Sequence, residues 1–143
     1  MKSSLLSALV LSVMVWPVGA YAQTSADSMG KVVKPDDMRW EPLEGGFEIT
    51  ILYTNPTTQA TYRVIRGPGN QHVPRHWHSS NESITVLQGT FVVAHDGSEE
   101  KTELRPGGFA YMPAKMIHEA WTGNAGATYF ITVDGKWDVN FVK

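Results

Sequence analysis

Short apolar runs, rich in β-branched and aromatic residues, recur along most of the chain, with turn residues between them. No stretch beyond residue 22 holds a helical period for three turns without a Gly or a Pro. Runs of this length and spacing are typical of an all-β sandwich or barrel. The expected strands are 47–54, 61–66, 83–87, 90–94, 109–112, 119–121 and 129–133.

The first 22 residues have the pattern of a secretory signal peptide. Lys2 precedes an apolar run over 5–18, and Ala-Tyr-Ala at 20–22 forms a small-x-small cleavage site. A membrane anchor is the alternative, but the run is interrupted at Pro17 and is shorter than the roughly 20 apolar residues of a spanning helix. We therefore expect cleavage near Ala22 and a periplasmic or secreted protein. No twin Arg precedes the run, which favours export in the unfolded state.

The rest of the chain reads as one domain. Residues 23–36 are small, polar and aperiodic and are expected to be a flexible lead-in, and residues 37–143 are expected to form the β-domain. With a net charge of -2 and 18% charged residues, no basic surface that would bind nucleic acid is expected. The absence of Cys excludes disulfides, thiolate metal sites and a cysteine nucleophile. No further membrane segment is expected after cleavage.

Two clusters along the chain contain the imidazole and carboxylate side chains that could bind a metal or take part in catalysis. His76 and His78 are two apart, so in a strand both point to the same face, and Glu82 follows after a short irregular step. His118 comes much later, after a turn that contains Pro113. Two neighbouring imidazoles, a carboxylate and a distant imidazole suit a divalent first-row metal. The imidazole-rich set without Cys favours Zn or Cu, with Mn, Fe and Ni as alternatives.

The other two histidines are expected to have structural roles. His72 is expected in a polar loop, and His95 precedes Asp96 and Gly97 at a hairpin tip. Four further side chains are candidates for a supporting shell around the metal, but the strand pattern does not fix which way they face: Arg63, Arg66, Tyr111 and Tyr129. Trp77 and Trp121 are expected on the outer face, covered by an arm around Trp40 or by a partner subunit.

The two clusters resemble the two motifs of the cupin superfamily. In the first, His-Trp-His at 76–78, Glu82 and Gly89 match in spacing, and only Gly69 is displaced by one residue. In the second, Gly107, Pro113 and His118 match.

Two positions of the second motif depart from the pattern, with Lys115 in place of a Gly and Thr122 in place of an Asn. The chain therefore resembles small single-domain bacterial cupins that carry both motifs.

This resemblance implies a double-stranded β-helix, the jelly-roll β-barrel, with one metal at its mouth. It implies His76, His78, Glu82 and His118 as the ligands, and a homodimer is common among such proteins. A mononuclear metal enzyme acting on a small oxygenated molecule is favoured: a dioxygenase, decarboxylase, lyase or isomerase. The alternative is a non-catalytic periplasmic protein that binds a metal or a small ligand, and no catalytic residue is assigned.

Overall fold

Strands dominate the computed structural model, which describes residues 30–143. The predicted signal peptide and residues 23–29, half of the predicted lead-in, lie outside the described residues. Residues from Lys31 to Lys143 form one compact unit. Its elements are η1 (Pro35–Asp37), β1 (Glu41–Pro42), η2 (Glu44–Gly46), β2 (Glu48–Thr54), β3 (Thr61–Gly67), β4 (His72–Trp77), β5 (Glu82–His95), β6 (Thr102–Leu104), β7 (Phe109–Met112), β8 (His118–Val133) and β9 (Asn140–Phe141).

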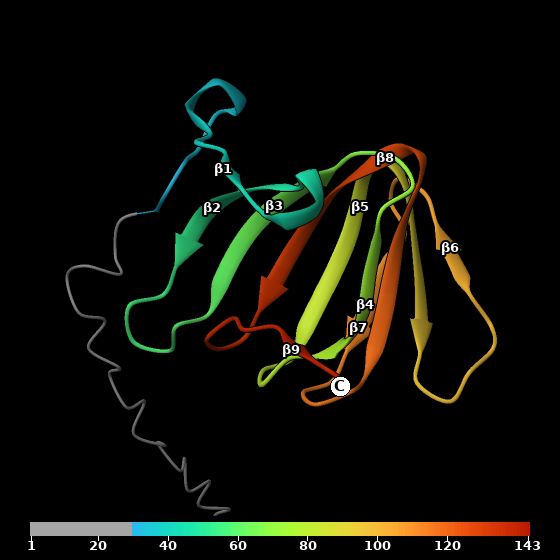
Figure 1. The fold of residues 1–143 in the computed structure, drawn as a ribbon. Coiled ribbons are helices and arrows are strands. Elements are labelled where there is room, and N and C mark those ends of the chain that lie inside the picture. Colours follow the sequence, from blue (N-terminus) through green and yellow to red (C-terminus); the bar gives the residue numbers. More distant parts are fainter. Residues whose placement is uncertain (1–29) are drawn as a thin grey trace, which may run out of the picture. The chain divides into compact units, whose positions relative to one another are not determined.

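Two long strands, β5 and β8, pair antiparallel along most of their length and organise the fold (Figure 1). The first half of β5 and the second half of β8 continue into a sheet with β7 on one side and β3, β2 and β1 on the other. The other halves continue into a sheet with β6 on one side and β4 and β9 on the other. The sheet thus curls over on itself, which confirms the predicted all-β jelly-roll barrel.

Each long strand replaces two strands that the sequence predicts. The segments 83–87 and 90–94 are one strand, β5, and the segments 119–121 and 129–133 are one strand, β8. The Gly-containing segments between them are irregularities within continuous strands and not chain reversals. The pairing of β5 with β8 is present both before and after residues 86–91. The separation into shorter strands was therefore wrong at these two places.

Apolar side chains from both halves meet between the two layers. The buried set includes Ile65, Ile84, Val86, Phe91, Val93, Met112, Tyr129, Ile131 and Val133. These positions alternate along their strands, as a sheet with one buried face requires. Burial of each such side chain contributes about 1.5–3 kcal/mol to stability.

The side chains that cover Trp121 differ from those that we expected. The Trp121 indole stacks on the His72 ring, with centroids 4.8 Å apart and planes inclined by 2°, and Lys101 Nζ lies 3.7 Å from its centroid. Trp40 instead packs under the Arg66 guanidinium at 4.1 Å. His72 and Lys101, rather than the arm around Trp40, therefore cover Trp121.

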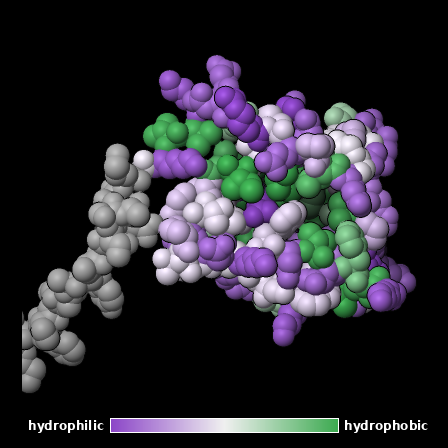
Figure 2. Space-filling model, turned by 60° about the vertical axis from the view of Figure 1, so that its left-hand side comes forward, coloured by the Kyte–Doolittle hydropathy of each residue, from purple (hydrophilic) through white to green (hydrophobic). Residues whose placement is uncertain are grey.

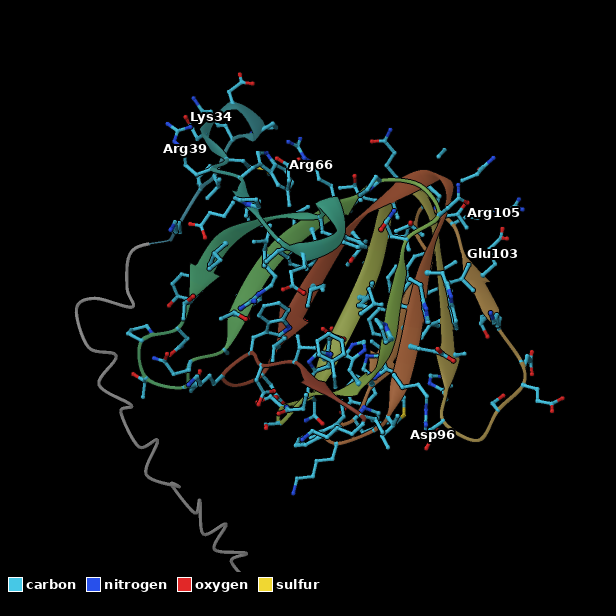
Figure 3. The ribbon with its side chains drawn as sticks, viewed as in Figure 1. Lys34, Arg39, Arg66, Asp96, Glu103 and Arg105 are labelled. Carbon is cyan, nitrogen blue, oxygen red and sulfur yellow. The ribbon has the colours of Figure 1, made fainter. Side chains whose placement is uncertain are left out.

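Charged pairs lie at the outside of the barrel. Arg66 pairs with Glu48, Arg105 with Glu103, and Arg75 with Asp96, and all of these side chains are well exposed. Figure 3 shows the labelled Arg66, Asp96, Glu103 and Arg105 at the periphery of the strands. Exposed pairs of this kind add little to stability. In the part of the chain that the structure describes, no helix is long and apolar enough to cross a membrane.

Candidate metal centre

The four residues of the two sequence clusters meet at one end of the barrel interior. His76 on β4 and His118 at the start of β8 are direct cross-strand partners. His78 follows the end of β4, and Glu82 opens β5. All four are nearly inaccessible, at 3–5% exposure. One nitrogen from each of the three imidazoles lies within 4.8 Å of the other two, so the three histidines could hold a metal ion.

Backbone carbonyls fix the orientation of each imidazole. His76 Nδ1 lies 2.6 Å from the Pro74 carbonyl oxygen, and His118 Nδ1 lies 3.0 Å from that of Met116. His78 Nδ1 is hydrogen-bonded to the Asp138 carbonyl. A carbonyl only accepts, so each ring carries a proton on Nδ1, and in the neutral form of each ring the Nε2 lone pair is left free. This is the tautomer that a metal-binding imidazole needs.

The Glu82 carboxylate lies beside these free nitrogens. Its Oε2 is 3.3 Å from His78 Nε2 and 3.7 Å from His118 Nε2. Burial lowers the pKa of His78, but Glu82 outweighs this effect and the net change is upward. Burial lowers the pKa of His118 and lowers that of His76 to about 4, which favours their neutral forms.

His78 Nε2 is buried without a well-formed hydrogen bond among the described residues. A buried nitrogen that makes no hydrogen bond is destabilising unless something else coordinates it. A cation that accepts the three Nε2 lone pairs satisfies all of them at once. Imidazoles with a carboxylate suit Zn, Cu, Fe, Ni or Mn, so the residues present fit a divalent metal.

The C-terminal segment holds the site from outside the sheet. Besides the carbonyl that contacts His78, Asp138 accepts hydrogen bonds through its carboxylate from Ser79 N at 2.8 Å and Ser79 Oγ at 2.6 Å. These bonds, chiefly that from the Ser79 hydroxyl, lower the pKa of Asp138. Asp134 accepts in the same way from Asn81 N at 3.0 Å. Sequence reasoning missed this support, because the partners are more than fifty residues apart.

A cavity of about 400 Å³ adjoins the imidazoles. Its walls are mostly apolar and include Phe47, Ile65, Phe91, Ile131 and Trp137. Figure 2 shows a hollow on one face with hydrophobic side chains gathered around it. The volume suits a small molecule.

The remaining candidate residues separate into inward and outward groups. Tyr129 and Arg63 are buried, whereas Tyr111 and Arg66 are exposed. His72 opens β4, contacts Glu119 at 2.9 Å and also borders the cavity, so the structural role remains a prediction. His95 is exposed at the end of β5.

The two departures from the cupin motifs have local structural explanations. Thr122 is buried, and its hydroxyl donates to the Pro68 carbonyl at 2.6 Å and accepts from Gln71 N at 2.9 Å. Lys115 has φ +66°, in the left-handed region that favours glycine. Its backbone N–H donates to the His78 carbonyl at 2.8 Å, so this turn contacts the candidate metal site directly.

We expect Lys115→Gly to stabilise the protein by about 0.5–1 kcal/mol, because glycine adopts this conformation without a Cβ penalty. Chemical denaturation monitored by tryptophan fluorescence would measure the change. Lys115→Ala is the matched control: it removes the same side chain but keeps the Cβ, and its stability should equal that of the wild type. An equal gain in both variants would assign the effect to the charge rather than to the backbone.

Three comparisons with known proteins agree with this architecture. The family model of the ChrR cupin-like domain matches residues 28–135. The anti-sigma-E factor ChrR of Cereibacter sphaeroides is 41% identical over 66 residues, which are 46% of this chain and 29% of that protein. The chain thus matches less than a third of the length of that relative.

Solved structures show the same fold. The polyketide cyclase RemF from Streptomyces resistomycificus superposes with a TM-score of 0.69 and 20% identity, over 80% of this chain and 87% of that chain. ChrR in complex with Rhodobacter sphaeroides SigE gives a TM-score of 0.57 and 26% identity, over 71% of this chain and 52% of that chain. With the family model covering most of its length, the chain belongs to the ChrR cupin-like domain family of the cupins.

Proposed function

We propose that this protein is a mononuclear metal-dependent cupin enzyme that acts on a small oxygenated molecule bound in the cavity. His76, His78, Glu82 and His118 would hold the metal. The observation that carries the proposal is the set of three buried imidazoles, each tied through Nδ1 to a carbonyl so that the Nε2 atoms converge beside Glu82.

A divalent metal held there would supply Lewis acidity, an activated water or, if redox-active, a site for O2. The chain's own residues prepare for it in two ways. The carbonyls of Pro74, Met116 and Asp138 orient the imidazoles before any metal arrives, which lowers the cost of assembling the site. The apolar cavity wall holds a substrate beside the metal and restricts water.

The test is elemental analysis of the protein recovered from its native compartment, followed by turnover assays. We expect one equivalent of a divalent metal per chain. Oxygen consumption and product formation would then be followed with small diols and carboxylic acids. Turnover that disappears on chelation and returns with the metal supports the enzyme proposal.

The nature of the metal follows from where it is acquired. We propose that residues 1–22 direct export in the unfolded state, so that the site fills outside the cytoplasm. An imidazole-rich site then selects by intrinsic affinity, which rises from Mn and Fe to Cu and falls at Zn. We expect Zn or Cu in the exported protein and a different metal after cytoplasmic expression without residues 1–22.

Inductively coupled plasma mass spectrometry of the two preparations measures this difference. Zn has no accessible second oxidation state, so Zn would leave hydrolytic, lyase or isomerase chemistry. Cu would favour a dioxygenase. Stoichiometric Fe in the exported protein would contradict the proposal that the site fills with Zn or Cu outside the cytoplasm. It would leave the proposed ligands unchanged.

A non-catalytic role is the second candidate, and one specific observation favours it. The 41%-identical relative is an anti-sigma-E factor, and its cupin-like domain is the family to which this chain belongs. On this alternative the protein would stay in the cytoplasm, contrary to the export proposed above, and the barrel would pass on the metal or ligand occupancy of its site to a protein partner such as a sigma factor. Full metal loading without turnover on any tested substrate, together with co-purification of a sigma factor, would favour it over the enzyme.

A further inference from the structure

Tyr129 lies in the middle of the sheet and faces the barrel interior. It is on β8, paired with Ile65 on β3 and with Val86 on β5, and the residue is only 5% exposed. Its ring packs against the Phe91 ring, with centroids 4.8 Å apart and planes inclined by 52°. Both rings border the cavity that adjoins the imidazoles. Tyr129 is therefore a buried phenol with one side on the cavity.

The Tyr129 hydroxyl has no hydrogen-bond partner within residues 30–143. Three unpartnered side-chain atoms there have no accessible surface, and the hydroxyl is not one of them: Arg63 Nε, His78 Nε2 and Trp137 Nε1. The hydroxyl therefore keeps accessible surface. Because the residue is enclosed by the barrel and its ring borders the cavity, this surface opens onto the cavity.

The electrostatic surroundings keep this phenol protonated. Burial raises the pKa of Tyr129 above its ordinary value, and the negative charge of Glu82 raises it further. The neutral hydroxyl can donate one hydrogen bond, and a buried donor that makes none is unfavourable. Since the protein offers no acceptor, the acceptor has to come from a molecule in the cavity.

The rest of the cavity wall determines the class of this molecule. Besides the candidate metal ligands, three side chains with polar groups share the wall with Tyr129: Glu44, Gln71 and His72. Glu44 is exposed to solvent, and the other two already make hydrogen bonds within the protein. In the described part of the chain no Lys or Arg borders the cavity, so an uncharged acceptor suits the site better than a carboxylate. A molecule in the cavity thus meets mostly apolar surface and a free donor at Tyr129.

We propose that the Tyr129 hydroxyl donates a hydrogen bond to the substrate and selects molecules with an apolar body and an uncharged accepting oxygen, such as a ketone or an ester carbonyl. The inference rests on the proposed function for the substrate and its metal, but the donor belongs to the chain itself and is present without the ion. The contact with Phe91 holds the ring in place before a ligand arrives, which lowers the cost of binding. An analogue without the oxygen is disfavoured, because it leaves the hydroxyl unpaired beneath it.

The test compares acetophenone with α-methylstyrene, which has the same shape but a CH2 group in place of the carbonyl oxygen. Their affinities are measured by ligand-observed NMR titration of metal-free and Zn-loaded protein, as wild type, Tyr129→Phe and Tyr111→Phe. Tyr129→Phe keeps the aromatic ring and removes only the hydroxyl. Tyr111→Phe is the matched control, because it removes an exposed hydroxyl of β7 that does not border the cavity.

In metal-free protein we expect Tyr129→Phe to weaken acetophenone binding by about three- to tenfold, as the loss of one neutral hydrogen bond provides. The affinity for α-methylstyrene should not fall, and Tyr111→Phe should change neither affinity. Equal binding of acetophenone to wild type and Tyr129→Phe, an equal loss for both probes, or no binding of either at millimolar concentration would overturn the proposal.

The infrared carbonyl band of bound acetophenone is a second measurement, which needs only metal-free wild type and serves if Tyr129→Phe does not fold by circular dichroism. A hydrogen bond lowers the frequency of this band relative to acetophenone in an apolar solvent, and an unshifted band would overturn the proposal. A protein that binds no metal but keeps the difference between wild type and Tyr129→Phe would refute the proposed function alone. Metal-dependent turnover that is unchanged in Tyr129→Phe, with equal acetophenone binding, would refute only the role of Tyr129.

Discussion

We expect the His118→Ala protein to lose most of its bound metal and the stabilisation that the metal provides. A ligand that binds only the folded barrel stabilises it by mass action, by about 2.7 kcal/mol at a hundredfold excess over Kd. His118 supplies one of three converging nitrogens and lies on a different strand from the other two, so its loss opens the site on one side. His76→Ala and His78→Ala should have the same effect. Elemental analysis measures the metal, and thermal unfolding with and without added Zn measures the stabilisation.

The change in Tm on adding Zn separates metal loss from damage to the core. Chelated wild type and chelated variants report the cost of truncating a buried imidazole, and only the wild type should then gain stability from Zn. His72→Ala and His95→Ala are the matched controls, because neither ring joins the buried cluster, and both should keep full occupancy. Full metal occupancy in His118→Ala would refute the assignment of the second sequence cluster to the site.

The candidate metal site could be predicted from the sequence because its signals are local. His76 and His78 share a face through the period of a strand, and both are buried while the intervening Trp77 is more exposed. What spacing alone could not provide is the pairing of His76 with His118, since cross-strand register depends on the whole topology. The resemblance to the cupin motifs supplied that link.

That β5 and β8 are each one continuous strand could not be predicted from the sequence in the same way. Glycine-containing steps near Gly89 and Gly126 have the composition of turns, yet in the structure they are bends in strands that stay paired. Local composition does not distinguish a bulge from a reversal, because both need the same backbone freedom.

The burial of Arg63 could not be predicted for a different reason. Along β3, the row of Thr61, Arg63 and Ile65 faces inward, while Tyr62 and Arg66 face outward. Each row contains an arginine and an apolar or aromatic residue, so alternation alone assigns neither row to the core. The packing of Trp137 against Arg63 comes from the C-terminal segment, for which the sequence has no local signal.

Replacing Gly89 by Ala should destabilise the protein by at least about 3 kcal/mol, a large part of the 5–15 kcal/mol that a domain of this size has. Gly89 has φ +74°, and a Cβ there would lie 2.1 Å from the Gly126 carbonyl oxygen. That atom is backbone in the paired strand β8, so it cannot move aside without breaking the ladder at the bend. Chemical denaturation and hydrogen exchange of the β5–β8 amides would measure the loss.

Gly97→Ala is the matched control for backbone strain. Gly97 has φ +78°, almost the same value, but no atom lies within 4 Å of its Cβ position. It should therefore cost only about 1 kcal/mol, the penalty of the left-handed conformation itself. The difference between the two variants measures the close approach of β5 and β8, which brings Glu82 and His118 from two strands into one site. If the two variants lost equal stability, the close approach of β5 and β8 at Gly89 would add nothing to the penalty of the left-handed conformation.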